Sequence, residues 1–253
     1  MLMAVDIGNT SISVGVFGTE GLIHHFRIRV TEQKTLCEAL SKELTPDILN
    51  QTKIIAVASV NPGVEKTFCT WLKDNYGRTS LKVGTDIPIK IPILVHNPER
   101  VGVDRLLNAI AAFQRMRTGA IVVDFGTAIT FDVVSDNGEY LGGAIAPGIE
   151  TSAYALNTRT AFLPRVSINK PSHALGKNTE EAISSGIYWG TVGMVERILR
   201  ELFNELGYQP KVIATGGDAE LIGPDIPLIS DIIPDLTLEG IRIVHAAYLF
   251  EKR

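Results

Sequence analysis

The chain has 253 residues, 45% of them hydrophobic and 21% charged, a composition typical of a globular protein with one or two cores. A formal net charge of −4 argues against nucleic acid as the main partner, although loops and helix ends can still build a local phosphate site. Asp6 interrupts the first apolar run and no eighteen apolar residues run together, so we expect no signal peptide and no membrane span. Cys37 and Cys69 lack metal-ligand spacing, and we expect a cytoplasmic protein with reduced thiols.

The first predicted element is a hairpin around residues 6–10, which read D-I-G-N-T. An apolar run precedes it and alternating apolar residues follow, a pattern that predicts strand, tight turn and strand. Gly8 lets backbone N–H groups approach a ligand closely, and Asp6 closes its strand where a carboxylate can meet a metal bound to phosphate. An ordinary hairpin shows the same letters, so this copy alone leaves both interpretations open.

The rest of the first half predicts a third strand, two helices and a second apolar strand. The alternation over residues 22–30 indicates the strand, and apolar stripes over 36–44 and 64–72 indicate the helices. The second helix follows the strand 54–60 and is capped by Asn61, with Pro62 in its first turn.

Residues 81–95 are short apolar pieces broken by Pro88 and Pro92, which suits edge strands or a connection over the surface. They lead into a helix that ends at Gly119, with Asp104 in or next to its first turn. The helix dipole and free N–H groups favour an ionised carboxylate there, and an ionised acid can accept a proton. A simple helix cap is the structural alternative for Asp104.

Residues 124–128 read D-F-G-T-A and repeat the first hairpin pattern. Their offset from Asp6, 124 − 6 = 118 residues, is close to half the chain. We therefore predict two α/β domains, residues 1–117 and 118–253, with the paired acidic loops facing a nucleotide site. The alternative is two halves that merely share turn chemistry.

The second half continues with a hairpin turn at residues 135–138 and a long helix that runs from Asn178 or Thr179 to near Gly207. This helix carries a stripe of small residues, Gly186, Gly190 and Gly193, which permits close packing within the chain or between chains. A strand at 212–214 then ends in T-G-G-D, residues 215–218, which we expect near the adenine or ribose of a nucleotide. The final helix is predicted to be core.

Seven blocks resemble the type III pantothenate kinases of the actin-like, sugar-kinase and heat-shock ATPase superfamily. They are D-I-G-N-T at 6–10, N-P-E-R-V-G-V-D-R at 97–105, D-F-G-T-A-I-T-F-D at 124–132, G-G-A-I-A-P-G at 142–148, A-L-N-T-R-T-A-F-L-P at 155–164, N-T-E-E-A-I-S-S-G at 178–186 and T-G-G-D at 215–218. The resemblance implies duplicated ribonuclease-H-like (actin-like ATPase) domains with mixed central sheets and a cleft between them.

The resemblance also implies site residues. The first hairpin would hold the ATP phosphates, and Asp6 would lie near Mg²⁺. The hairpin residues concerned are Asp6, Ile7, Gly8, Asn9, Thr10, Ser11, Ile12 and Ser13. Asp124 would bind a monovalent cation, K⁺ or NH₄⁺, and Thr127 would contact ATP. Asp104 would be the catalytic base, and pantothenate would be bound by Gly102, Val103, Asp104, Arg105 and, across a homodimer interface, Thr179.

The implied activity is phosphorylation of pantothenate by ATP to 4′-phosphopantothenate, the first step of coenzyme A biosynthesis. Phosphoryl transfer needs a cradle for charged oxygens, a divalent ion and an acid that takes the hydroxyl proton, and the residue patterns supply all three. Val95 departs from the family, which often has an aromatic residue nine positions before the base. Two alternatives stay open: a kinase of the same superfamily with another small hydroxylated substrate, and a non-enzymatic nucleotide-binding regulator.

Overall fold

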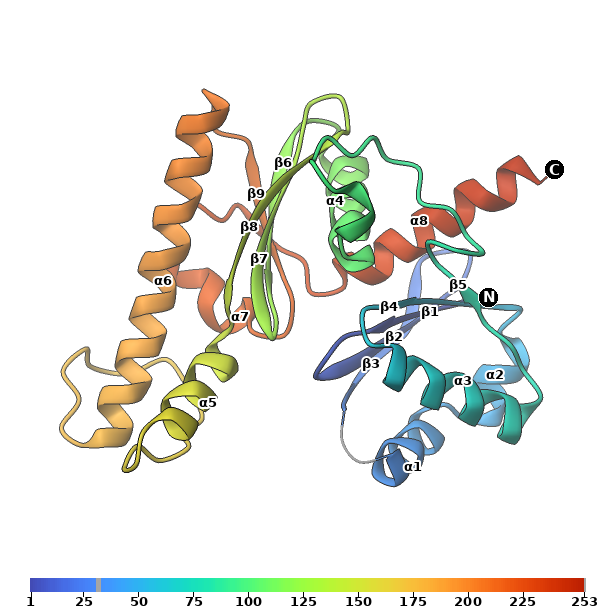
Figure 1. The fold of residues 1–253 in the computed structure, drawn as a ribbon. Coiled ribbons are helices and arrows are strands. Elements are labelled where there is room, and N and C mark those ends of the chain that lie inside the picture. Colours follow the sequence, from blue (N-terminus) through green and yellow to red (C-terminus); the bar gives the residue numbers. More distant parts are fainter. Residues whose placement is uncertain (31–32, 253) are drawn as a thin grey trace. The chain divides into compact units, whose positions relative to one another are not determined.

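The computed structural model describes residues 1–30 and 33–252 and is drawn in Figure 1. The chain forms two compact units. Unit 1 comprises Met1–Pro92, His96–Ala111 and Asp235–Arg253, and unit 2 comprises Ile93–Val95 and Ala112–Pro234.

Unit 1 is built on a five-stranded mixed sheet. Its strand order is β3 (Leu22–Arg29), β2 (Ser11–Phe17), β1 (Leu2–Ile7), β4 (Ile54–Ser59) and β5 (Leu81–Lys82). Strands β1, β2 and β3 pair antiparallel, whereas β4 pairs parallel with both β1 and β5. The predicted third strand is therefore confirmed. Within residues 81–95, Leu81–Lys82 forms the edge strand, and the remaining residues of the segment form no further strand.

Helices cover both faces of the sheet of unit 1 (Figure 1). One face carries α1 (Gln33–Glu43), α2 (Pro46–Gln51) and α3 (Pro62–Tyr76), and the other carries α8 (Leu236–Glu251). As predicted, Asn61 caps α3: its Oδ1 accepts a hydrogen bond from the Val64 N–H at 3.2 Å. The leucines and aromatic residues of α1, α2 and α3 bury against alternate residues of β1 and β2, which is why both strands read as apolar on this face.

Unit 2 repeats this architecture. Its strand order is β10 (Asp231–Ile232), β9 (Lys211–Thr215), β6 (Ala120–Phe125), β7 (Ala128–Val134) and β8 (Tyr140–Pro147). Helices α5 (Ile149–Arg159), α6 (Thr179–Leu206) and α7 (Ala219–Ile222) pack on one face of that sheet, and Asn178 and Gly207 cap the two ends of α6.

Two 3₁₀ turns, Pro98–Arg100 and Gly223–Asp225, and helix α4 (Val103–Met116) complete the elements.

The two sheets have the same connectivity. In each, a first strand pairs antiparallel with the second and parallel with the fourth: β1 with β2 and β4, and β6 with β7 and β9. Asp6 and Asp124 therefore occupy equivalent positions, one residue before the last residue of the central strand. The duplicated α/β architecture predicted from the two hairpins is confirmed.

The unit boundaries differ from the division at residue 117. Helix α8 packs on β1, β2 and β4 of unit 1, although it is the last element of the chain. Leu238, Ile241 and Val244 bury its apolar side, and Gly240 lies so close to the Leu107 carbonyl that a Cβ there would collide with it. Such contacts join segments far apart in sequence, so hydrophobic periodicity does not reveal them.

No helix within the described ranges combines the length and the hydropathy that crossing a membrane requires.

Candidate functional site

The β1–β2 hairpin of unit 1 presents the predicted phosphate-binding residues. Gly8 N–H donates to the Ser11 carbonyl at 2.9 Å and closes the turn, and Asn9 and Thr10 at its tip are exposed. The Thr10 carbonyl accepts from the Val30 N–H at 2.8 Å, which ties the tip to the end of β3. Ile7 and Ile12 are fully buried and anchor the hairpin in the core, so only its polar side is available to a ligand.

Asp104 lies in the first turn of α4, as predicted. Its Oδ1 accepts a hydrogen bond from the Arg105 N–H at 2.8 Å. Burial raises the pKa of Asp104 above its ordinary value, and the Arg105 N–H and guanidinium oppose that rise. A Cβ at Gly102 would collide with the Asp104 carboxylate, so a larger residue at position 102 would require that carboxylate to shift. Gly102, Val103, Asp104 and Arg105 are therefore brought together at one helix start, each of them partly exposed.

Asp124 lies at the corresponding hairpin of unit 2, between β6 and β7. The loop after β9 packs directly against it: Gly216 has φ of +93°, and a Cβ there would collide with the Asp124 carboxylate. Asp218 N–H donates to the Phe125 carbonyl at 3.1 Å and fastens this loop to the hairpin. The T-G-G-D segment, expected from sequence near adenine or ribose, thus also forms the wall beside Asp124.

Thr127 is exposed at the tip of the same hairpin. Its carbonyl accepts from the Gly148 N–H at 3.0 Å and from the Thr151 hydroxyl at 2.6 Å, which joins the tip to the start of α5. A Cβ at Gly148 would collide with the Gly126 carbonyl. The Pro147-Gly148 pair therefore serves close approach of backbone to the hairpin.

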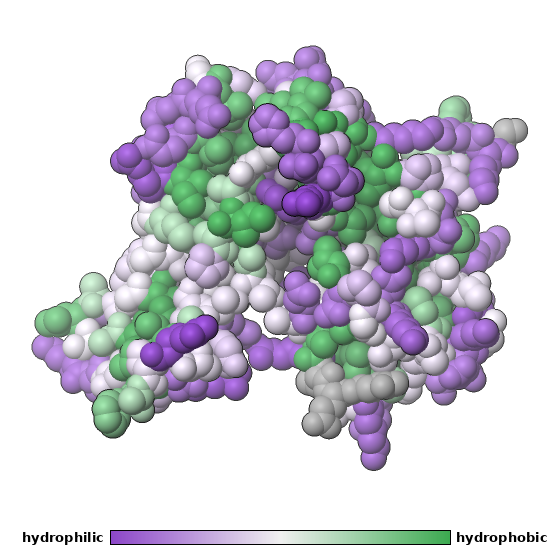
Figure 2. Space-filling model, in the orientation of Figure 1, coloured by the Kyte–Doolittle hydropathy of each residue, from purple (hydrophilic) through white to green (hydrophobic). Residues whose placement is uncertain are grey.

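Thr179 is the first residue of α6. It lines an apolar groove of about 540 Å³ between α5 and α6, together with Leu156, Leu163, Ala182, Ile183, Gly186 and Ile187. Hydrophobic atoms are exposed at this end of unit 2, mixed with polar ones (Figure 2). They include Tyr154 and Phe162, whose exposed fractions are 60% and 94%.

Three polar contacts on the two sheets were not singled out from the sequence. Arg27 on β3 donates from Nε to the Ser13 hydroxyl at 2.9 Å. In unit 2, the buried Asp132 accepts hydrogen bonds from the Thr130 and Tyr140 hydroxyls, both at 2.9 Å. The alternation of residues along each strand was the available signal. It does not show that Arg27 and Ser13 share a sheet face, because that depends on the strand register, which sequence alone does not give.

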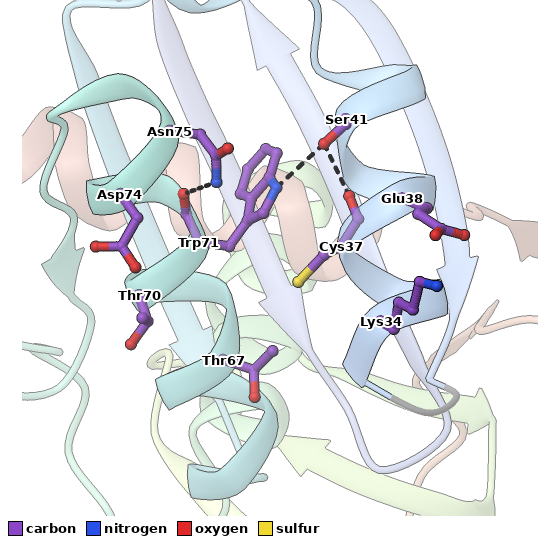
Figure 3. A pocket seen from close by; sticks show the side chains of 9 residues that line it. All are labelled: Lys34, Cys37, Glu38, Ser41, Thr67, Thr70, Trp71, Asp74 and Asn75. Atoms are coloured by element: carbon purple, nitrogen blue, oxygen red, sulfur yellow. Dashed lines mark hydrogen bonds between the residues drawn. The ribbon is translucent and has the colours of Figure 1, made fainter.

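A second groove, of about 510 Å³, lies between α1 and α3 of unit 1 (Figure 3). Trp71 points across it, and its indole N–H donates to the Ser41 hydroxyl at 3.2 Å. None of the predicted site residues lines this groove. Trp71 is 5% exposed and acts as core, in agreement with its helical spacing.

The donor set suits ions that are bound largely by oxygen from a ligand or from water. Among residues 1–30 and 33–252, no three His, Cys, Asp or Glu side chains gather as a metal cage. Mg²⁺ ordinarily takes one or two carboxylates and completes its shell with phosphate and water. The half-buried Asp6 fits such a role.

Solved structures resemble the fold along its whole length. A protein described as a Baf family transcriptional activator from Campylobacter jejuni has a TM-score of 0.61 and 22% sequence identity, with 97% of this chain and 98% of that chain covered. MreB 5 of Spiroplasma citri bound to AMPPNP has a TM-score of 0.55 and 11% identity, with 99% and 97% covered. The fold is that of the actin-like ATPases, as the sequence predicted.

Sequence comparison narrows this class. A sequence model of the type III pantothenate kinases matches residues 2–201. The type III pantothenate kinase of Moorella thermoacetica is 41% identical over 250 residues, with 97% of this chain and 98% of the relative covered. The chain belongs to the type III pantothenate kinase family.

Proposed function

We propose that the protein transfers a phosphoryl group from ATP to pantothenate and forms 4′-phosphopantothenate, the first step of coenzyme A biosynthesis. The observation that carries this proposal is the match to type III pantothenate kinases along 97% of the chain. Phosphoryl transfer needs a cradle for phosphate oxygens, compensation of their charge and a group that receives the hydroxyl proton.

The cradle is the β1–β2 hairpin, residues 6–13. Backbone N–H groups of a glycine-containing turn and the side chains of Asn9, Thr10 and Ser11 offer donors to phosphate oxygens. The fully buried Ile7 and Ile12 keep these donors in place before ATP arrives. Thr127 contacts ATP from the equivalent hairpin of unit 2.

Asp104 is the catalytic base that receives the proton of the attacking hydroxyl. A base works best when its pKa approaches the working pH, and burial moves the pKa of Asp104 in that direction. Arg105 binds the pantothenate carboxylate, because a guanidinium pairs well with a carboxylate, and Gly102 and Val103 form the adjacent pocket wall.

Two ions accompany the reaction. Asp6 would hold Mg²⁺ beside the ATP phosphates, directly or through water, and the ion would neutralise phosphate charge there. Asp124 would hold a monovalent cation, K⁺ or NH₄⁺. Gly126 and Gly216 lie beside this carboxylate. Because neither glycine has a Cβ, the carboxylate and nearby backbone oxygens remain close to one another.

The protein acts as a homodimer in which Thr179 contributes to the pantothenate site of the neighbouring protomer. The exposed face of α6 supports this arrangement. A Cβ at Gly186, Gly190 or Gly193 would meet no atom within 4 Å in the described chain, so the small-residue stripe does not serve packing within the protein. Exposed apolar side chains on the neighbouring α5 and the loop after it extend this surface.

The test is a coupled ADP-release assay with pantothenate, ATP and Mg²⁺, with and without K⁺, on the wild type and on Asp104→Asn. We expect pantothenate-dependent turnover that falls about 10²- to 10⁴-fold in Asp104→Asn, while ATP affinity is retained. If the wild type binds ATP but shows no turnover with pantothenate, the substrate must be another small hydroxylated molecule. Equal loss of turnover and of ATP affinity in Asp104→Asn would mean that Asp104 is not the base.

A further inference from the structure

Three side chains form a row across the sheet of unit 1. Asp6 of β1 pairs with Ser13 of β2, and Ser13 pairs with Arg27 of β3. Side chains of directly paired residues point to the same face of a sheet, so all three share one face. Neighbouring strands lie about 4.8 Å apart, which places the Arg27 backbone roughly 10 Å from that of Asp6. An arginine side chain spans most of that distance.

The contact of Arg27 leaves most of its hydrogen-bonding capacity available. Its Nε–H donates to the Ser13 hydroxyl at 2.9 Å, and Ser13 is only 4% exposed. Over residues 1–30 and 33–252, no ion pair joins Arg27 to a carboxylate. By contrast, His25, two residues earlier on the same face, has its Nε2 3.2 Å from the Asp235 Oδ1. The two Nη groups of Arg27 therefore form an exposed cationic fork.

Helix α8 covers the other end of this sheet face. A Cβ at Gly15, the residue of β2 that pairs with His25, would lie 3.1 Å from the Leu238 side chain of α8. Arg27 and Ser13 lie one row nearer the hairpin tip, where the Thr10 carbonyl bonds to the Val30 N–H. The guanidinium of Arg27 therefore lies at the end of this sheet face that is nearer to the predicted phosphate cradle.

We propose that Arg27 is a phosphate-binding residue of the nucleotide site, held beside the β1–β2 hairpin by its hydrogen bond to Ser13. This inference rests on the proposed function of that hairpin as the ATP cradle. A guanidinium offers two parallel N–H groups that match phosphate oxygens, which a lysine ammonium does not. The hairpin residues 6–13 contain no Lys or Arg, so Arg27 supplies positive charge that the cradle lacks.

The experiment is isothermal titration calorimetry of MgATP and of adenosine into the wild type, Arg27→Gln and Arg27→Lys. Arg197→Gln is the matched control, because it removes one positive charge from an exposed ion pair on α6 of unit 2. We expect the Kd for MgATP to rise about 10- to 100-fold in Arg27→Gln, as for the loss of a charged hydrogen bond. Arg27→Lys should recover part of that affinity, and adenosine binding should be unchanged in all variants.

Three outcomes would overturn the inference. If Arg27→Gln binds MgATP as the wild type does, Arg27 does not touch phosphate. If Arg27→Gln loses MgATP and adenosine affinity by the same factor, together with a lower Tm, its bond to Ser13 is purely structural. If the wild type itself binds no MgATP, the proposed function fails and the inference fails with it, which separates this case from the first two.

Discussion

Asp104 is the residue whose protonation bears most directly on the proposed chemistry. Burial raises its pKa, while the Arg105 N–H and guanidinium lower it. The net direction is upward, so the carboxylate takes up a proton at a higher pH than an ordinary aspartate, for which the pKa is about 3.9. Base catalysis is therefore expected to weaken from a higher pH as the solution becomes more acidic.

We predict that a ¹³C NMR titration of the Asp104 carboxyl carbon, assigned by its absence in Asp104→Asn, gives a midpoint above about 3.9. Replacing Arg105 by Gln should move the midpoint further upward, because the stabilising charge is removed. Asp136 is the internal comparison: hydrogen bonds from Thr118 and the Gly119 N–H hold its pKa below the usual range. A midpoint for Asp104 as low as that of Asp136 would contradict the prediction.

The sequence predicted some of the candidate site residues and missed others. Asp6, Asp104 and Asp124 stood out because each lies near the end of an apolar strand or in the first turn of a helix, two residues from a glycine. Arg27 did not stand out, because alternating Arg residues on a strand are ordinary surface residues until strand pairing puts one opposite Ser13. The contacts of Asp132 were missed for a related reason. Its partner Tyr140 lies on β8 and becomes a neighbour only through the pairing of β7 with β8, whereas its partner Thr130 lies two residues earlier on β7 itself.

At the scale of the element, α8 carries a buried histidine. His245 is 7% exposed, and its Nε2 has no hydrogen-bond partner among the residues described. Burial lowers the pKa of His245, so the folded state keeps it neutral while the unfolded chain becomes protonated below about pH 6.5. The unfolded state then binds more protons, and stability decreases as the pH falls below that value.

We predict that the wild type loses stability between pH 7.5 and pH 5.5, and that His245→Leu loses less over the same interval. Urea unfolding at both pH values measures the difference. His173, which is exposed, is the control: His173→Gln should keep the wild-type pH dependence. An unchanged pH dependence in His245→Leu would show that other groups dominate.

The elements themselves followed closely from local sequence. Asn61 and Pro62 start α3, Asn178 starts α6 and Gly207 ends it, because each residue has a backbone or capping preference that acts locally. Gly207 has φ of +77°, which lies in the left-handed region that favours glycine. Local chemistry of this kind requires no knowledge of the tertiary fold.

At the scale of the whole molecule, the exposed glycine stripe of α6 makes the proposed dimer testable. Gly190 is exposed and would accept a side chain without collision in the described chain. A large charged side chain there should block close approach of a second copy while leaving the protomer folded.

We predict that the wild type sediments as a dimer and Gly190→Arg as a monomer with a similar Tm. Gly190→Ala is the control, and it should remain dimeric and gain up to about 1 kcal/mol from helix propensity. Sedimentation velocity and thermal melting monitored by circular dichroism measure the two properties. A dimeric Gly190→Arg would exclude this face of α6 as the interface.

The sequence by itself determined the duplicated α/β plan, the two acidic hairpins and the helix that carries Asp104 in its first turn, because hydrophobic period, turn residues and caps act over a few positions. Only the tertiary structure showed that α8 packs as part of unit 1, that Gly216 lies against the Asp124 carboxylate and that Arg27 donates a hydrogen bond to Ser13. These contacts join residues far apart in the chain or on different strands. They depend on strand register and on which apolar face covers which sheet, and no local preference encodes either.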